Sequence, residues 1–252
     1  MIQRPVLAAN WKMNQGPTEA RAFIAAFLGA YSPRSDRTII IFPPALSLTA
    51  TRDALGGRSD IQLGVQNIHS ETKGAFTGEN SAPMARDAGA RIALVGHSER
   101  RHVFGETDEA TAKKCAVALQ HSLAPMLCVG EKIEEREKGR TEEIVIRQLK
   151  AGLSLLEKAQ LAGVLIAYEP VWAIGTGKTA TPADASEVHD VIRQHLVKQC
   201  GSPERAAAIP ILYGGSANRD NAKSLLAARG VDGLLVGGAS LDVSSWSAIA
   251  ST

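Results

Sequence analysis

Three side chains in the sequence could together move a proton between carbon atoms: Lys12, His97 and Glu169, each of which follows a short apolar run. A carboxylate can act as a general base, an imidazole can donate or accept a proton near neutral pH, and an ammonium group can stabilise a developing oxyanion. Each also has a structural explanation: Glu169 as a salt-bridged acid, His97 as a hydrogen-bonded histidine and Lys12 as a solvated charge. The chemistry therefore depends on a fold that brings the three together.

Two glycine-bearing segments add a candidate phosphate site. Gly214-Gly215-Ser216 and Gly237-Gly238 each follow an apolar run. Glycine lets backbone N–H groups approach an anion closely, and successive N–H groups can form an anion-binding nest. Taken singly, each glycine pair could simply make a tight turn. Because both stand at the ends of neighbouring predicted strands, phosphate binding is the favoured interpretation.

The segment Pro170–Lys178 is predicted to be a lid. Pro170 and Trp172 stiffen one end, and Ile174-Gly175-Thr176-Gly177 combines an apolar residue with glycines. Such a segment can close over a ligand and exclude water. The alternative is an ordinary surface loop, which would leave the apolar side chains of the segment exposed without an explanation.

Eight short apolar, β-branched runs are distributed along the chain and could position these groups at their ends. Most are continuous rather than alternating, as expected of strands buried on both faces of a parallel sheet. The runs are Val6–Ala9, Thr38–Phe42, Ile61–Val65, Ile92–Val95, Pro125–Val129, Val164–Tyr168, Ile209–Tyr213 and Gly233–Val236.

Helix-like segments separate the runs. Thr18–Leu28 gathers apolar residues on one face, Thr107–Gln120 opens with a predicted threonine N-cap, and a helix is predicted to start at Thr181-Pro182-Ala183-Asp184. Repeated β-then-α units without a linker predict an α/β fold, a (β/α)8 TIM barrel of eight parallel strands with outer helices, as a single domain over residues 1–252. An open doubly wound sheet stays an alternative, although the first turn lacks the G-x-G-x-x-G pattern.

Composition limits the classes of partner. The 252 residues carry a formal net charge of +2, from 28 basic and 26 acidic side chains. This balance, without a long basic run, indicates neither nucleic acid nor an anionic membrane as a partner, and no apolar stretch is long enough for a signal peptide or a membrane span. Cys115, Cys128 and Cys200 lack metal-ligand spacing and are interpreted as thiols, so a cytoplasmic protein without a metal site is expected.

Seven segments, in order and at matching spacing, resemble the triosephosphate isomerase family nearly end to end. Any one short motif could mislead, but this many together are highly specific. The segments are Asn10-Trp11-Lys12-Met13-Asn14, Gly74-Ala75-Phe76-Thr77-Gly78-Glu79, Val95-Gly96-His97-Ser98-Glu99-Arg100-Arg101, Cys128-Val129-Gly130-Glu131, Tyr168–Lys178, Tyr213-Gly214-Gly215-Ser216 and Gly233-Leu234-Leu235-Val236-Gly237-Gly238-Ala239-Ser240-Leu241.

The resemblance implies interconversion of D-glyceraldehyde 3-phosphate and dihydroxyacetone phosphate through an enediol(ate), without a cofactor. It implies Glu169 as the general base, His97 as the electrophile that polarises the carbonyl, and Lys12 with Asn10 as the groups that hold the substrate and stabilise the enediolate. The family is itself the standard example of a neutral histidine whose pKa is lowered by a helix N-terminus. A helix that begins just after His97 is therefore expected.

The resemblance also implies further contacts around these groups. Glu99 resembles the acid that organises Lys12, and Cys128 is either a neighbour of Glu169 or a small buried hydrophobe. The phosphate is expected at a set of residues with backbone N–H groups as the main donors: Gly175, Ser216, Gly237 and Gly238.

The long loop Gln66–Pro83 resembles the arm that reaches into a partner subunit. Thr77 stands near its tip, and Glu79 is expected to pair with Arg100. The resemblance thereby implies a homodimer in which each active site is completed by its neighbour.

Two other functions stay open on the sequence. A different phosphate-binding (β/α)8 barrel enzyme would share the glycine loops but not the set of Lys12, His97 and Glu169. A non-catalytic binding role could be added to the barrel, and the sequence carries no feature that tests it.

Overall fold

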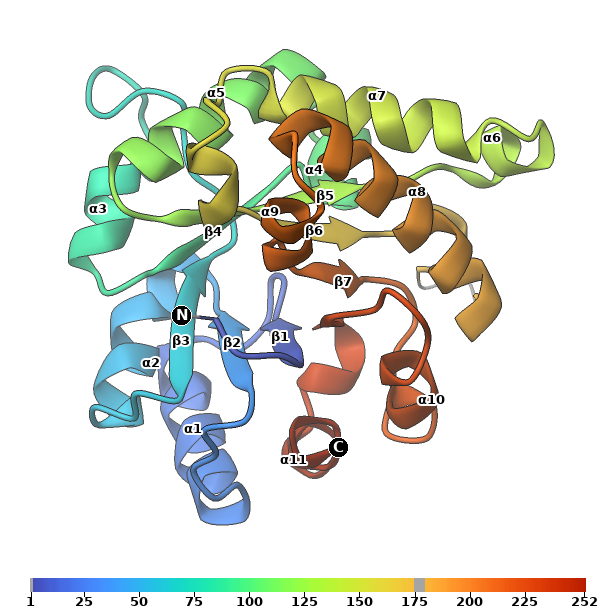
Figure 1. Ribbon diagram of the computed structural model, residues 1–252. Coiled ribbons are helices and arrows are strands. Elements are labelled where there is room, and N and C mark those ends of the chain that lie inside the picture. Colours follow the sequence, from blue (N-terminus) through green and yellow to red (C-terminus); the bar gives the residue numbers. More distant parts are fainter. Residues whose placement is uncertain (1, 175–179) are drawn as a thin grey trace.

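The computed structural model describes residues 2–174 and 180–252, in which eight parallel strands form a closed barrel (Figure 1). β1 pairs with both β2 and β8, and the other strands pair in chain order. The predicted (β/α)8 TIM barrel is confirmed, and the open sheet is excluded because β8 returns to β1. The strands are β1 Val6–Asn10, β2 Thr38–Phe42, β3 Ile61–Val65, β4 Ile92–Val95, β5 Ala124–Val129, β6 Leu165–Tyr168, β7 Ile211–Tyr213 and β8 Gly233–Val236.

The strands are continuously apolar because both of their faces are buried. In β1, Val6 and Ala8 belong to the cluster that fills the barrel interior. Leu7 and Ala9 belong to the larger cluster between the strands and the helices. A strand whose alternate side chains enter two different cores has no solvent face that would require polar residues.

Helices surround the barrel (Figure 1). They are α1 Pro17–Ala30, α2 Leu48–Leu55, α3 Ala82–Asp87, α4 Ser98–His102, α5 Asp108–Gln120, α6 Ile133–Glu137, α7 Thr141–Leu153, α8 Pro182–Cys200, α9 Pro203–Ala208, α10 Ala222–Leu226 and α11 Val243–Ser251. Short 3₁₀ turns lie at η1 Ala45–Ser47, η2 Gln160–Gly163, η3 Val171–Ala173 and η4 Gly238–Ser240.

Two predicted helix starts are confirmed by their capping contacts. The Thr107 hydroxyl accepts the N–H of Ala110 at 3.2 Å, and α5 begins at the next residue. Thr181 and Asp184 form a reciprocal capping box at the start of α8. Such caps satisfy N–H groups that the first helical turn leaves without partners.

Two strands begin later than the apolar runs predict. β7 begins at Ile211 and not at Ile209, because Ile209 is the C-cap of α9 and Pro210 has no N–H to donate to the ladder. β6 begins at Leu165, because Val164 is the C-cap of the preceding 3₁₀ turn.

The carboxyl ends of parallel barrel strands share one rim. The segments after β1, β4, β6, β7 and β8 therefore meet there, and they carry the candidate residues predicted from the sequence. Within the described ranges, every helix is too short or too polar to span a membrane.

Candidate active site

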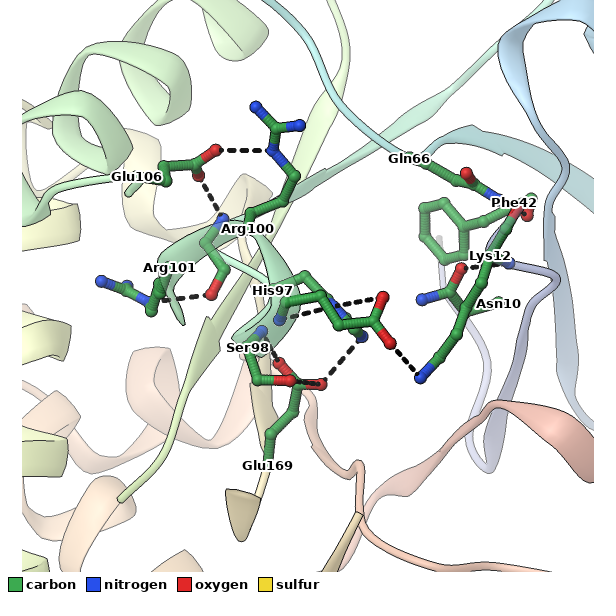
Figure 2. Close-up of polar contacts among 12 residues, drawn as sticks. Asn10, Lys12, Phe42, Gln66, His97, Ser98, Arg100, Arg101, Glu106 and Glu169 are labelled. Carbon is green, nitrogen blue, oxygen red and sulfur yellow. Dashed lines mark hydrogen bonds and ion pairs between the residues drawn. The ribbon is translucent and has the colours of Figure 1, made fainter. Parts of the chain in front are cut away.

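Glu169 directly follows β6 and is buried at this rim, with 3% of its side chain exposed. Its Oε1 lies 3.0 Å from Nε2 of His97. Its Oε2 accepts the backbone N–H of Ser98 at 3.0 Å, and Oε1 accepts the Ser98 hydroxyl at 3.3 Å (Figure 2). The fold therefore brings Glu169 and His97 into contact from separate strands.

These contacts keep Glu169 ionised although it is buried. Burial alone raises the pKa of a carboxyl group, but the charge and hydrogen bond of His97, the N–H of Ser98 and the thiol of Cys128 together lower the pKa of Glu169. Burial and the same carboxylate raise the pKa of the Cys128 thiol well above its usual value. Cys128 therefore lies beside Glu169 as a neutral thiol.

His97 is the N-cap of α4, which begins at the next residue as expected. Its Nδ1 accepts the backbone N–H of Glu99 at 3.3 Å, so the neutral ring carries its proton on Nε2, which faces Glu169. Burial lowers the pKa of His97, but the charge and hydrogen bond of Glu169 together with the charge of Glu99 raise it by more. A ligand that separated His97 from Glu169 would remove the main group that raises this pKa, whereas burial and the helix N-terminus, which favour the neutral ring, would remain.

Lys12 has a left-handed backbone, with φ of +52°, which is uncommon for a residue other than glycine. The Asn10 side chain accepts the Lys12 N–H at 3.0 Å, and the Gln66 amide donates to the Lys12 carbonyl at 2.8 Å (Figure 2). Its ammonium pairs with Oε1 of Glu99 at 2.6 Å. Glu99 thus contacts Lys12 with its carboxylate and the His97 ring with its backbone.

A cavity of about 300 Å³ opens between these side chains and the glycine loops. A cavity of this size suits a small ligand. The catalytic and phosphate-binding candidates face it together, except Gly175, which lies outside the described residues. Among the described residues, no group of three or more His, Cys, Asp or Glu side chains is arranged to hold a metal ion. The cavity is lined by Asn10, Lys12, His97, Glu169, Ile174, Gly214, Gly215, Ser216, Ala217, Asn218, Leu235, Gly237, Gly238 and Ala239.

The two glycine loops differ in how closely they approach the site. A Cβ on Gly214 would lie 2.9 Å from Cγ of Glu169, and a Cβ on Gly215 would lie 2.1 Å from the Tyr213 hydroxyl. No atom lies within 4 Å of the corresponding position on Gly238. The backbone after β7 is therefore packed against the base, whereas the backbone after β8 is open to a ligand.

Gly130, after β5, packs against the backbone of Glu169. A Cβ at this glycine would lie 1.7 Å from the Glu169 carbonyl oxygen. The Glu169 N–H donates to the Val129 carbonyl at 2.8 Å, and the Gln148 side chain bonds to both the N–H and the carbonyl of Gly130. The ends of β5 and β6 are thus held tightly together beneath the base.

Two contacts at the rim were not predicted from the sequence. Ser98 holds Glu169 largely through its backbone N–H. Nearly every residue type carries this group, so the contact cannot be recognised from the sequence. Glu131 is fully buried and accepts hydrogen bonds from the Tyr168 hydroxyl at 3.2 Å and the Trp172 indole at 2.9 Å. Its position just past a buried strand is the signal that also marks Glu169.

Of the three residues predicted to meet a partner subunit, two are exposed in the single chain and Arg100 is partly buried. Thr77 and Glu79 are both exposed. Among the ion pairs of the described residues, Arg100 pairs with Glu106, with 3.3 Å between Nε and Oε2, and not with Glu79. The predicted Glu79–Arg100 pair is therefore not formed within one chain.

Comparison with known proteins points to one family. The family model described as triosephosphate isomerase matches residues 5–252. The chain is 48% identical to the triosephosphate isomerase of Roseiflexus sp. (strain RS-1), over 97% of this chain and 96% of that protein. It is 48% identical to that of Moorella thermoacetica, over 98% of each chain. It is 47% identical to that of Carboxydothermus hydrogenoformans, again over 98% of each chain.

Proposed function

Because this chain belongs to the triosephosphate isomerase family, we propose that Lys12, His97 and Glu169 carry out its reaction, the interconversion of D-glyceraldehyde 3-phosphate and dihydroxyacetone phosphate. This is an intramolecular aldose–ketose isomerisation of glycolysis and gluconeogenesis. The observation that carries the assignment is the 3.0 Å contact between His97 Nε2 and Glu169 Oε1, on the wall of one cavity with Lys12.

The proposed chemistry is a proton transfer between neighbouring carbons. The Glu169 carboxylate removes the proton from the carbon next to the carbonyl, and the C–H electron pair forms the double bond of the enediolate. Such a proton is weakly acidic, so its removal requires simultaneous stabilisation of the oxygen. His97 donates its Nε2 proton to that oxygen, and Lys12 offsets its charge.

The reaction is completed by the same groups. His97 regains a proton from the other hydroxyl, so that the hydrogen moves between the two oxygens. The protonated Glu169 returns its proton to the neighbouring carbon as the new carbonyl forms. Both groups end in their starting protonation states, which a catalyst requires.

Glu169 must exchange partners when substrate enters. In the structure its carboxylate is occupied by His97 and by the N–H and hydroxyl of Ser98. We infer that substrate replaces these contacts, since the carbon acid has to approach the same oxygens. The contacts hold the base ionised and oriented until then.

We infer that the phosphate binds the backbone at Gly175, Ser216, Gly237 and Gly238. The open backbone at Gly238 supports this, as does the cation beside the same loop: a Cβ on Gly237 would lie 3.9 Å from Lys12 Nζ. Protein donors that hold the phosphate in place also disfavour its loss from the enediolate.

A homodimer is proposed from the exposed surface beside the site. A second cavity of about 210 Å³ borders Lys12, His97 and Glu99 and is also lined by Met13 and Phe104. Met13 is 94% exposed and Phe104 is 65% exposed, which is unusual for large apolar residues placed together. A loop from a second copy, carrying Thr77 and Glu79, would cover them and bring Glu79 to Arg100.

We propose that residues 1–252 form a single domain and that the protein works in the cytoplasm. The closed barrel and the family match across residues 5–252 support the first proposal. The second rests on the three unpaired, buried cysteines and on the glycolytic reaction.

The decisive experiment compares the purified protein with its Glu169→Gln variant in the conversion of glyceraldehyde 3-phosphate to dihydroxyacetone phosphate. We expect the variant to lose roughly 10²–10⁴-fold in kcat, because the amide cannot act as a base. Inhibition by inorganic phosphate should stay unchanged, since the phosphate-binding backbone is untouched. The matched control is Glu109→Gln, at an exposed position of α5. Near-normal turnover in the Glu169 variant would overturn the assignment, and equal low rates in both proteins would reveal host isomerase.

A further inference from the structure

A buried ion pair lies outside the cavity and contacts Gly96, the residue before His97. The Glu106 and Lys114 side chains are 2% and 9% exposed and approach to 2.7 Å. A buried ion pair contributes little net stability compared with apolar residues of similar volume, since both charges lose their hydration. Its position next to a reacting group therefore calls for another explanation.

The Glu106 carboxylate holds the peptide group between Val95 and Gly96, one residue before His97. Its Oε1 accepts the backbone N–H of Gly96 at 2.8 Å (Figure 2). Its other oxygen accepts hydrogen bonds from Lys114 and, at 3.3 Å, from Arg100. These two cations fix the carboxylate, and the carboxylate in turn fixes the Gly96 N–H.

Arg101 holds the same glycine from its other end. Its Nε donates to the Gly96 carbonyl at 2.8 Å, and its Nη2 donates to the Cys128 carbonyl at 3.1 Å. Gly96 adopts φ of +70°, and a Cβ there would lie 2.7 Å from Arg101 Nη2. Gly96 is thus held in a left-handed conformation by one ionised side chain at each end.

This conformation determines where the imidazole points. His97 is the next residue, and consecutive Cα atoms are about 3.8 Å apart, so a rotation of about 15° at Gly96 would move even the His97 Cα by about 1 Å. A displacement of this size at a reacting atom costs on the order of 100-fold in rate.

We propose that Glu106 and Arg101 are positioning residues for His97, which act through the backbone of Gly96 and touch no substrate atom. The inference rests on the proposed function, because it takes His97 as the group that polarises the carbonyl. It assigns a task in catalysis to a buried ion pair that lies outside the cavity.

The test compares two double variants that differ in one hydrogen-bond acceptor. Glu106→Gln/Lys114→Met keeps an oxygen for the Gly96 N–H, and Glu106→Leu/Lys114→Met removes it. Both eliminate the charges of Glu106 and Lys114 together, and both remove the Glu106 partner of Arg100, whose side chain is 30% exposed, so the two variants differ only in the acceptor. The matched control, Glu109→Leu/Lys113→Met, makes the same change on the exposed face of α5.

We expect the glutamine-containing variant to keep kcat within about threefold of the parent, and the leucine-containing variant to lose about 10- to 100-fold in kcat with KM nearly unchanged. The ¹⁵N resonances of His97, identified by their loss in His97→Gln, should shift only in the leucine-containing variant. Equal kcat values in the two folded variants would overturn the proposal. So would a loss of kcat that recovers as protein concentration rises, because that would assign the ion pair to subunit association.

Arg101→Lys provides a second route if the leucine-containing variant does not fold. Lysine cannot donate to the Gly96 and Cys128 carbonyls with the same planar geometry, so kcat should fall with KM nearly unchanged, and an unchanged kcat would refute the positioning role.

The His97→Gln variant distinguishes a failure of the proposed function from a failure of the positioning role. Full activity in that variant would refute the proposed function itself, whereas its inactivity together with active Glu106 and Arg101 variants would refute only the positioning role.

Discussion

Gly130→Ala should test whether the base is positioned by the packing of the strand ends beneath it. The new Cβ would lie 1.7 Å from the Glu169 carbonyl oxygen, so the two must separate by about 1.3 Å to reach even 3.0 Å. The backbone of Gly130 is held by Gln148 and that of Glu169 by Val129, so neither segment moves alone. When the backbone of Glu169 shifts to relieve this contact, its carboxylate shifts with it.

A displacement of about 1 Å at the base costs on the order of 100-fold in kcat, and overpacking of this kind costs about 1–3 kcal/mol in stability. KM should change little, because Gly130 is not among the residues that line the cavity. The assay is steady-state isomerisation by the variant, with thermal unfolding measured in parallel to verify that the protein is folded.

Gly29→Ala is the matched control, since no atom lies within 4 Å of its absent Cβ and the residue is within α1. We expect full activity and a gain of roughly 0.5–1 kcal/mol in stability. If folded Gly130→Ala kept kcat within about threefold of the parent, the argument that strand packing positions the base would be refuted.

Three further predictions concern charge, assembly and acid sensitivity. Because its contacts lower the pKa of Glu169, this carboxyl group should titrate below pH 4.5 in the free protein, followed by NMR of ¹³C-labelled glutamate and identified by its loss in Glu169→Gln, and a titration centred near pH 6 would contradict this. Thr77→Arg should weaken the dimer and activity together, and a fully active monomer in sedimentation would refute the intersubunit reading. Burial lowers the pKa of His189 to about 4, below the 6.5 of the unfolded chain, so its contribution to stability is complete above pH 6.5 and is lost as pH falls toward 4. His189→Asn should therefore remove about 3 kcal/mol of pH dependence across that window in urea titrations, and an unchanged dependence would refute the argument.

The sequence was sufficient to predict the barrel because its strands are apolar on both faces. Each run keeps its character over four or five residues, so strand existence is robust and only the ends shift. Pro210 moved one such end because it cannot donate to the ladder. Helices of five or six residues, such as α3 and α6, are too short for their periodicity to be recognised in the sequence.

Within the site, the sequence predicted residues whose chemistry resides in a side chain at a strand end. It could not predict contacts made by the backbone, such as the Ser98 N–H that holds Glu169. It also did not indicate that Arg100 meets Glu106 within one chain, and the pairing of Arg100 with Glu79 across a dimer interface stays a prediction. Gly105, with φ of +71°, turns the chain between Arg100 and Glu106, and no helical spacing signals their approach.

The left-handed backbone of Lys12 has a consequence for how this protein would respond to selection. A residue other than glycine in this conformation is strained by about 1–3 kcal/mol, and here the hydrogen bond that Lys12 donates to Asn10 and the one that it accepts from Gln66 maintain it. A laboratory screen for heat resistance alone would therefore favour glycine at this position and discard the ammonium group with the strain. Thermal stability favours glycine at position 12, whereas turnover requires lysine there. Directed evolution of the protein therefore needs an activity criterion in every round.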